Sequence, residues 1–276
     1  YICSSPEACS LGAASRGLMS ATEEESPPQQ PEGEGQETLE ATALPLPSLL
    51  FEQDFAQFEE ALQDGSWEVD GDNLNLYLCE EGDGKLGGAV LVTEGNCDSD
   101  AELVRCLDCS GSQGGEGPRV TRVTTQLLCE ELDEGSGGAF TAALAYGEDL
   151  VEAMLLALTL RRARPDADEE DTGGKPIALF ANGTSVVEDI GPLPRRVELE
   201  AVLHWDEDPR RTVVQYRILP APGAEGAGAV GAECLTGEAT VGFYTTSAKF
   251  EGAKAFCLRA TGTTRIQFLH ASCACA

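Results

Sequence analysis

Five arginines gather around one predicted hairpin of a chain that is poor in positive charge. The whole sequence has 18 Lys and Arg against 48 Asp and Glu. A planar guanidinium group can bind a carboxylate through two parallel hydrogen bonds, so such a group of arginines could form an anion-binding rim. The alternative is that they pair with neighbouring Glu198, Glu200 and the acidic turn Asp206–Asp208 as exposed ion pairs. The arginines are Arg195, Arg196, Arg210, Arg211 and Arg217.

The cysteines offer two further candidate sites. Cys106 and Cys109 form a Cys-x-x-Cys pair, and Cys273 and Cys275 lie two residues apart. A structural zinc ion needs about four ligands, and only Cys97 lies near the first pair. A redox role would require a strand before the pair and a helix after it. The sequence therefore leaves metal binding, redox chemistry and simple burial open for these thiols.

The sequence gives little support for acid–base catalysis or for phosphate binding. The chain has two histidines, His204 and His270, and the pattern around His204 places it on the polar face of a strand. The glycine-rich run 111–117 lacks the Lys-Ser/Thr of a phosphate-binding loop. No catalytic residue is predicted, and whether the chain is an enzyme stays open.

The net charge of −30 limits the possible partners. Residues 51–150 carry 23 acidic and 4 basic residues, so the charge is concentrated there. A negative field of this size repels nucleic acids, and we expect no nucleic-acid partner. A solvated acidic surface or docking to a basic protein both fit this charge.

The first 47 residues are predicted to be a disordered acidic leader. Residues 22–47 are rich in Pro, Gln, Gly and Glu and lack periodicity, so they cannot bury enough apolar surface to offset the entropy of ordering. The Ser- and Ala-rich residues 1–22 resemble the end of an organelle transit peptide, which suggests an organelle and plausibly a chloroplast. No run of about 18 apolar residues is present, so no transmembrane segment is expected.

An amphipathic helix is predicted over residues 49–63. Phe51, Phe55, Phe58 and Leu62 recur at helical spacing and form one apolar stripe, and Gly65 ends the helix. This stripe should cover the open end of a sheet or barrel.

From Gly65 onward the apolar period changes to two, which is typical of half-buried strands. The clearest example is residues 197–205, where Val, Leu, Ala, Leu and Trp alternate with residues that are mostly polar. The turn Asp206–Pro209 then leads into a return strand that contains Tyr216, so a hairpin is expected. Residues 150–162 fit either a helix or a strand, and we interpret them as a strand. At least nine antiparallel strands over residues 48–276 predict one mainly β domain, a barrel or a sandwich.

The stretch Gly65-Ser66-Trp67, which lies after a helix and before a series of strands, resembles the lipocalin-like (calycin) barrels. In that family a Gly-x-Trp motif opens the first strand and a late arginine packs over the Trp ring, here Arg259 or Arg265. Residues 180–219 are similar to algal and cyanobacterial members that are related to bilin chromophore lyases.

This resemblance implies that the barrel binds or carries a small apolar or amphipathic ligand, such as a lipid, a bilin or another pigment. The expected ligand-binding residues are Arg195, Arg196, Arg211, Arg217, Tyr216 and Trp205. The alternative function is a structural or assembly subunit of a larger complex, such as a photosynthetic one, that docks through its acidic surface. No cofactor beyond such a ligand is expected.

Overall fold

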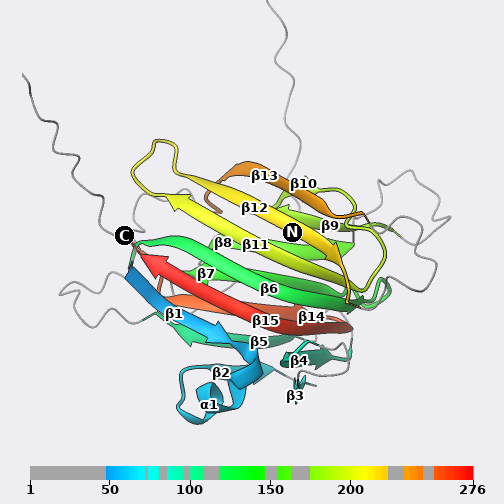
Figure 1. The fold of residues 1–276 in the computed structure, drawn as a ribbon. Helices are drawn as coiled ribbons and strands as arrows, with labels where there is room; N and C mark the ends of the chain where they lie inside the picture. Colours follow the sequence, from blue (N-terminus) through cyan, green and yellow to red (C-terminus); the bar gives the residue numbers. More distant parts are fainter. Residues whose placement is uncertain are drawn as a thin grey trace, which may run out of the picture. The chain divides into compact units, whose positions relative to one another are not determined.

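Two antiparallel sheets packed face to face form the protein in a computed structural model of the chain (Figure 1). The structure describes residues 48–71, 74–80, 86–95, 100–107, 118–146, 154–162, 175–222, 233–244 and 252–275. The predicted leader over residues 1–47 lies outside them. Among the described residues, no helix is long and apolar enough to cross a membrane.

Sheet A has eight strands in the order β13-β12-β11-β6-β15-β4-β3, with β1 also paired to β15. Its strands are β1 (Ser48–Asp54), β3 (Leu74–Cys79), β4 (Gly88–Thr93), β6 (Val120–Leu132), β11 (Arg195–His204), β12 (Arg211–Pro220), β13 (Leu235–Gly242) and β15 (Thr264–Cys275). The long strand β15 is central, because it pairs with β6 along most of its length and with β4 and β1 on its other side.

Sheet B has seven strands in the order β10-β9-β8-β7-β14-β5-β2. Its strands are β2 (Glu68–Gly71), β5 (Asp100–Cys106), β7 (Ala139–Ala145), β8 (Met154–Arg162), β9 (Ile177–Ala181), β10 (Thr184–Val187) and β14 (Ala255–Thr261). Strand β8 confirms the interpretation of residues 150–162 as a strand for the part of that segment that the structure describes.

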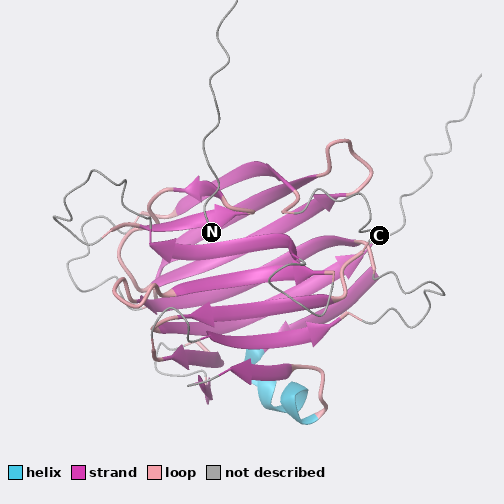
Figure 2. Cartoon of the chain, turned by 180° about the vertical axis from the view of Figure 1, so that it is seen from behind, coloured by secondary structure: helices cyan, strands magenta, loops and turns pink. Residues whose placement is uncertain are grey.

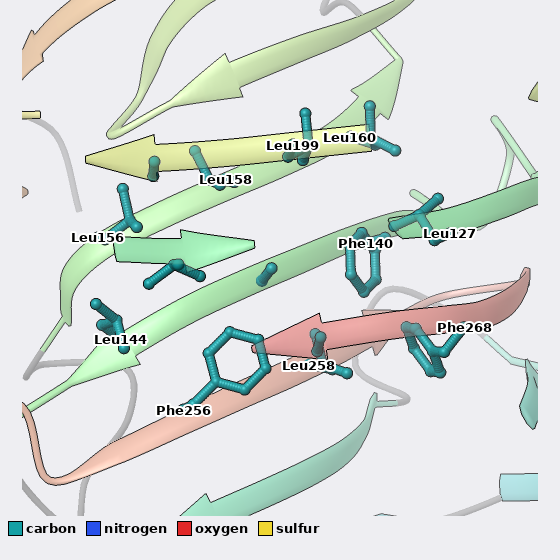
Figure 3. Packing of buried hydrophobic residues seen from close by; sticks show 14 of the residues in the cluster. Leu127, Phe140, Leu144, Leu156, Leu158, Leu160, Leu199, Phe256, Leu258 and Phe268 are labelled. Atoms are coloured by element: carbon teal, nitrogen blue, oxygen red, sulfur yellow. The ribbon is translucent and has the colours of Figure 1, made fainter. Parts of the chain in front are cut away.

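The core lies between the two sheets and is filled by side chains. Strand β11 alternates buried and half-buried residues along its whole length, as the sequence pattern predicts. Large apolar side chains from both sheets point into the same layer (Figure 3). Examples from the two sheets are Leu127, Leu199 and Phe268 on sheet A and Phe140, Leu158 and Phe256 on sheet B.

The predicted closed barrel is wrong, and so is the resemblance to lipocalin-like barrels that was drawn from Gly65-Ser66-Trp67. The described strands form two separate sheets, each with its own pair of edge strands, rather than one sheet closed on itself. Period-two alternation reports only that one face of each strand is buried, and a sandwich satisfies that condition as well as a barrel does. The link to pigments, bilin lyases and photosynthesis came from the resemblance and loses its basis with it.

The predicted helix over residues 49–63 is only partly present. Residues 48–54 form strand β1, followed by a 3-10 turn at Phe55–Gln57 and a short helix, α1, at Phe58–Gln63 (Figure 2). The free edge beside the second half of β15 takes up the first part of this segment as a strand. The apolar stripe is nevertheless buried, because Phe51, Phe55 and Phe58 all lie in the core.

Trp67 is buried beside these phenylalanines, and the arginine that faces it is neither Arg259 nor Arg265. Its ring contacts Phe51, Phe55 and Phe58, and its Nε1 donates to Oε1 of Gln53 at 3.2 Å. The cation next to the ring is Arg105, whose guanidinium carbon lies 5.8 Å from the ring centroid.

The two arginines that the lipocalin-like pattern assigned to Trp67 lie elsewhere. Arg259 is on the outer face of sheet B, where it pairs with Asp100 and Glu102. Arg265 is on the outer face of sheet A, where it pairs with Glu130. The expected closure of a barrel base by Gly65, Trp67 and a late arginine is therefore replaced by an aromatic cluster at one end of the sandwich.

Candidate functional site

The outer face of sheet A carries a row of polar side chains that crosses several neighbouring strands. The strand registers place Gln126 of β6 opposite Glu198 of β11, Glu198 opposite Arg217 of β12, and Arg217 opposite Thr236 of β13. A second row two residues away joins Thr124, Glu200, Gln215 and Glu238 in the same way. Because alternate residues of a strand face the same side, all of these side chains point away from the core.

A hollow of about 450 Å³, here called hollow I, lies over these rows. Its outward-facing lining offers carboxylates, amides, hydroxyls and one guanidinium group. These are Thr124, Gln126, Glu198, Glu200, Gln215, Arg217, Thr236 and Glu238. The lining thus mixes hydrogen-bond acceptors with donors at close spacing.

Neighbouring side chains hold the polar groups of hollow I in place. Glu198 lies between two arginines, with Arg196 Nη2 at 2.8 Å from one carboxylate oxygen and Arg217 Nη1 at 3.6 Å from the other. Arg196 Nη2 also donates to Oε1 of Gln126 at 3.2 Å. Gln215 Nε2 donates to Oε2 of Glu238 at 3.0 Å. A ligand would therefore meet side chains whose orientation is already fixed, which reduces the entropy lost on binding.

Two of the predicted anion-rim arginines, Arg196 and Arg217, belong to this polar surface. Both contact Glu198, so their charge is met by a carboxylate of the protein itself. The other three lie apart from them, and the guanidinium carbon of Arg210 is 5.6 Å from the ring centroid of Trp205. Arg195 points inward and is 3% exposed, and its Nη1 donates to the main-chain oxygen of Glu233 at 3.2 Å. Arg211 lies at the opposite end of the hairpin and pairs with Glu207.

The two predicted aromatic site residues face the core side of sheet A. Trp205 is buried, and its Nε1 donates to the main-chain oxygen of Val120 at 2.6 Å. Tyr216 packs against the core, and its hydroxyl lies so close to Gly237 that a Cβ on that glycine would be 2.3 Å from it. The sequence pattern missed Gln126, Gln215 and Glu238, because isolated polar residues on separate strands carry no local signal until the register aligns them.

The cysteine candidates do not form a metal site in the part of the chain that the structure describes. No group of three or more His, Cys, Asp or Glu residues there could hold a metal ion. Cys109 and Cys97 lie outside the described residues. Cys273 is buried in the core, where desolvation raises the pKa of its thiol, whereas a metal ligand needs the thiolate.

A larger hollow of about 550 Å³ lies at the end of the sandwich near the start of β9, but its two basic groups are already engaged. Arg162 donates to the main-chain oxygens of Leu132 and Lys175 at 3.1 and 2.6 Å. Lys175 pairs with Glu134 at 3.4 Å. These contacts join the ends of β6 and β8 to the residues before β9. Hollow I is the better candidate for binding a ligand because its polar side chains come from four neighbouring strands in register.

No protein-family model matches this sequence, and no curated protein matches it. Solved structures share its arrangement only distantly. One is a carbohydrate esterase of the Shiga toxin-encoding bacteriophage phi24B, at 9% identity and a TM-score of 0.40, which covers 83% of this chain and 99% of its own. The metal-free lectin I-B4 of Griffonia simplicifolia is 8% identical with a TM-score of 0.39, and the match covers 81% and 98% of the two chains. Alginate lyase vAL-1 from a Chlorella virus is 9% identical with a TM-score of 0.40, and covers 79% and 97%. Similarity at this level assigns neither a family nor an activity.

Proposed function

We propose that the protein binds a carbohydrate in hollow I, on the outer face of sheet A. The observation that carries the proposal is the aligned polar surface itself, in which acceptors and donors from four neighbouring strands converge on one hollow. A sugar presents hydroxyl groups that each donate and accept hydrogen bonds, so it matches a surface of alternating carboxylate, amide and guanidinium groups.

Other ligand classes fit hollow I less well. A lipid or pigment needs an apolar cavity, whereas the space between the sheets is filled and hollow I is lined by polar groups. A nucleic acid needs a basic surface, whereas the lining of hollow I has three carboxylates and one arginine. A peptide interface is usually anchored by exposed aromatic or apolar side chains, and the outward-facing residues of hollow I are polar.

The arrangement favours binding over hydrolysis. Hydrolysis of a glycosidic bond commonly needs one protonated carboxyl group as the acid and one carboxylate as the base or nucleophile. Glu198 contacts Arg196 and Arg217, and Glu200 contacts Arg122 at 3.2 Å, so both of these carboxylates are ion-paired. The third carboxylate, Glu238, accepts a hydrogen bond from Gln215 at 3.0 Å. Ion-paired carboxylates orient hydroxyl groups, which is the role that we assign to them.

The test is a binding screen with a matched pair of variants. Fluorescently labelled protein is applied to an array of neutral oligosaccharides built from glucose, mannose, galactose and xylose, and the strongest probe is then measured by calorimetry. Glu198→Gln should weaken its binding at least tenfold, about 1.4 kcal/mol, because a charged acceptor at the centre of the site is lost.

Glu102→Gln is the control. Glu102 is also an ion-paired strand residue with a similar exposure, 18% of its side chain against 21% for Glu198, but it lies on the outer face of sheet B. We expect it to bind like the parent protein. A folded Glu198→Gln protein with parental affinity, or an array on which no sugar binds, would contradict the proposal.

A further inference from the structure

A second hollow, here called hollow II, lies beside hollow I on the same face of sheet A. It has a volume of about 390 Å³ and includes Leu128 and Glu130 of β6 together with Arg265 and Gln267 of β15. The outward-facing residues of β6 run in order through both hollows, with Gln126 in hollow I and Leu128 and Glu130 in hollow II. Successive outward residues of a strand are about 7 Å apart, so the two hollows are adjacent.

Arg196 lies at the boundary between the two hollows. It is opposite Leu128 of hollow II in the strand register, and its guanidinium group contacts Gln126 and Glu198 of hollow I. Its Nε is buried and has no hydrogen-bond partner among the described residues. The same side chain therefore borders both hollows.

Together the two hollows are longer than a single sugar ring. Glu238 of β13 lies at one end and Gln267 of β15 at the other, and β12, β11 and β6 lie between these strands. Four inter-strand steps of about 4.8 Å give a span of roughly 19 Å. A ligand that fills this length is a chain of several rings.

The charged groups of the protein indicate that the ligand is uncharged. Among the described residues that line hollow II, the charged side chains are Glu130 and Arg265, which form an ion pair with each other. Hollow I has more carboxylates than guanidinium groups, and the whole protein has a net charge of −30. A polymer of uronic acids, or of sulfated or phosphorylated sugars, would be repelled by the carboxylates of hollow I and by the net negative charge of the protein.

We propose that hollows I and II form one groove for an extended, uncharged oligosaccharide, with hollow II as a second subsite. This inference rests on the proposed binding of carbohydrate in hollow I and adds the length and the charge class of the ligand. Hollow I supplies the contacts that a short sugar uses, and the region around Arg265 adds contacts that only a longer chain reaches.

The test measures affinity against chain length for the full chain. Gluco-, manno-, galacto- and xylo-oligosaccharides of one to six rings are titrated calorimetrically, with alginate and heparin oligosaccharides of matched length as anionic comparators. We expect the affinity for one neutral series to rise at least tenfold between the shortest binding member and the longest, and the anionic series to bind more weakly.

A matched pair of arginine variants locates the second subsite. Arg265→Gln should reduce the affinity for the longest chain to that of the short one and leave the short chain unaffected. Arg259→Gln is the control, because Arg259 is also an ion-paired strand arginine but lies on the outer face of sheet B. It should leave every affinity unchanged.

The outcomes separate the two proposals. Affinity that does not depend on chain length, an Arg265→Gln protein that binds long chains like its parent, or tighter binding of the anionic series would each overturn the extended neutral groove while hollow I remains a sugar site. Failure of every chain to bind, including the single sugars, would overturn the proposed function and the groove with it.

Discussion

At the residue scale, the structure separates side chains that the sequence places in the same category. Arg195 and Arg196 are adjacent in the sequence, yet the first is buried on the core side of β11 and the second borders the ligand hollow. For these two arginines the side of the strand on which the residue lies, rather than its type, decides what it can do. The cysteines differ in burial: Cys257 of β14 is buried, and Cys234, which precedes β13, is exposed.

This division predicts which thiols react. Desolvation raises the pKa of the Cys257 thiol to about 12, so the reactive thiolate is almost absent near pH 8. With iodoacetamide at pH 8, Cys234 should be alkylated in the folded protein while Cys257 stays unmodified, as read by peptide mass spectrometry. Unfolding in urea should make Cys257 react as well, which serves as the control. Equal labelling of the two sites in the folded protein would show that Cys257 is not buried.

At the element scale, period-two alternation predicted most of the strands correctly, and the hairpin of β11 and β12 lies where the turn Asp206–Pro209 indicated. The errors arise where tertiary contacts outweigh a local pattern. Residues 48–54 have helical spacing but form β1, because β15 offers them an unpaired edge. The distinction between sandwich and barrel, and the alignment that builds hollow I, depend on pairings between distant strands. Such pairings leave no trace in a single sequence.

One small turn joins the two sheets and gives a prediction for an element. Asn182, in the turn between β9 and β10, has a φ of +49°, accepts from the main-chain N–H of Ala157 at 2.8 Å and donates to the main-chain oxygen of Gly242 at 2.6 Å. Asn182→Ala should lower the free energy of unfolding by about 2–3 kcal/mol, because it removes both hydrogen bonds and places a residue with a Cβ-only side chain in the left-handed region.

Urea denaturation followed by tryptophan fluorescence measures this loss. Ser185→Ala in the same hairpin is the matched control and should change the stability by less than about 0.5 kcal/mol, because Ser185 is exposed. If both variants lose the same small amount, Asn182 does not connect the sheets.

At the scale of the whole molecule, the charge is the dominant feature. A net charge of −30 on a folded chain produces self-repulsion, which favours the unfolded state, and dissolved salt screens it. We expect the midpoint of thermal unfolding to rise when sodium chloride is increased from 10 to 300 mM at pH 7, as measured by calorimetry. Binding of an uncharged sugar should show little dependence on salt over the same range. A midpoint that falls with salt would indicate that ion pairs such as Arg259–Glu102 outweigh the repulsion.

The position of the last two strands has a consequence for how the protein is made. Strand β14 joins β7 to β5 in sheet B, and β15 joins β6 to β4 and β1 in sheet A. Both sheets are thus divided in the middle until residues 255–275 have been translated and have left the ribosome. During synthesis the earlier strands expose apolar faces and unpaired edges that these two late strands will cover. The growing polypeptide therefore has to be kept from aggregating until these two strands have paired, and its strong negative charge helps to keep neighbouring nascent chains apart.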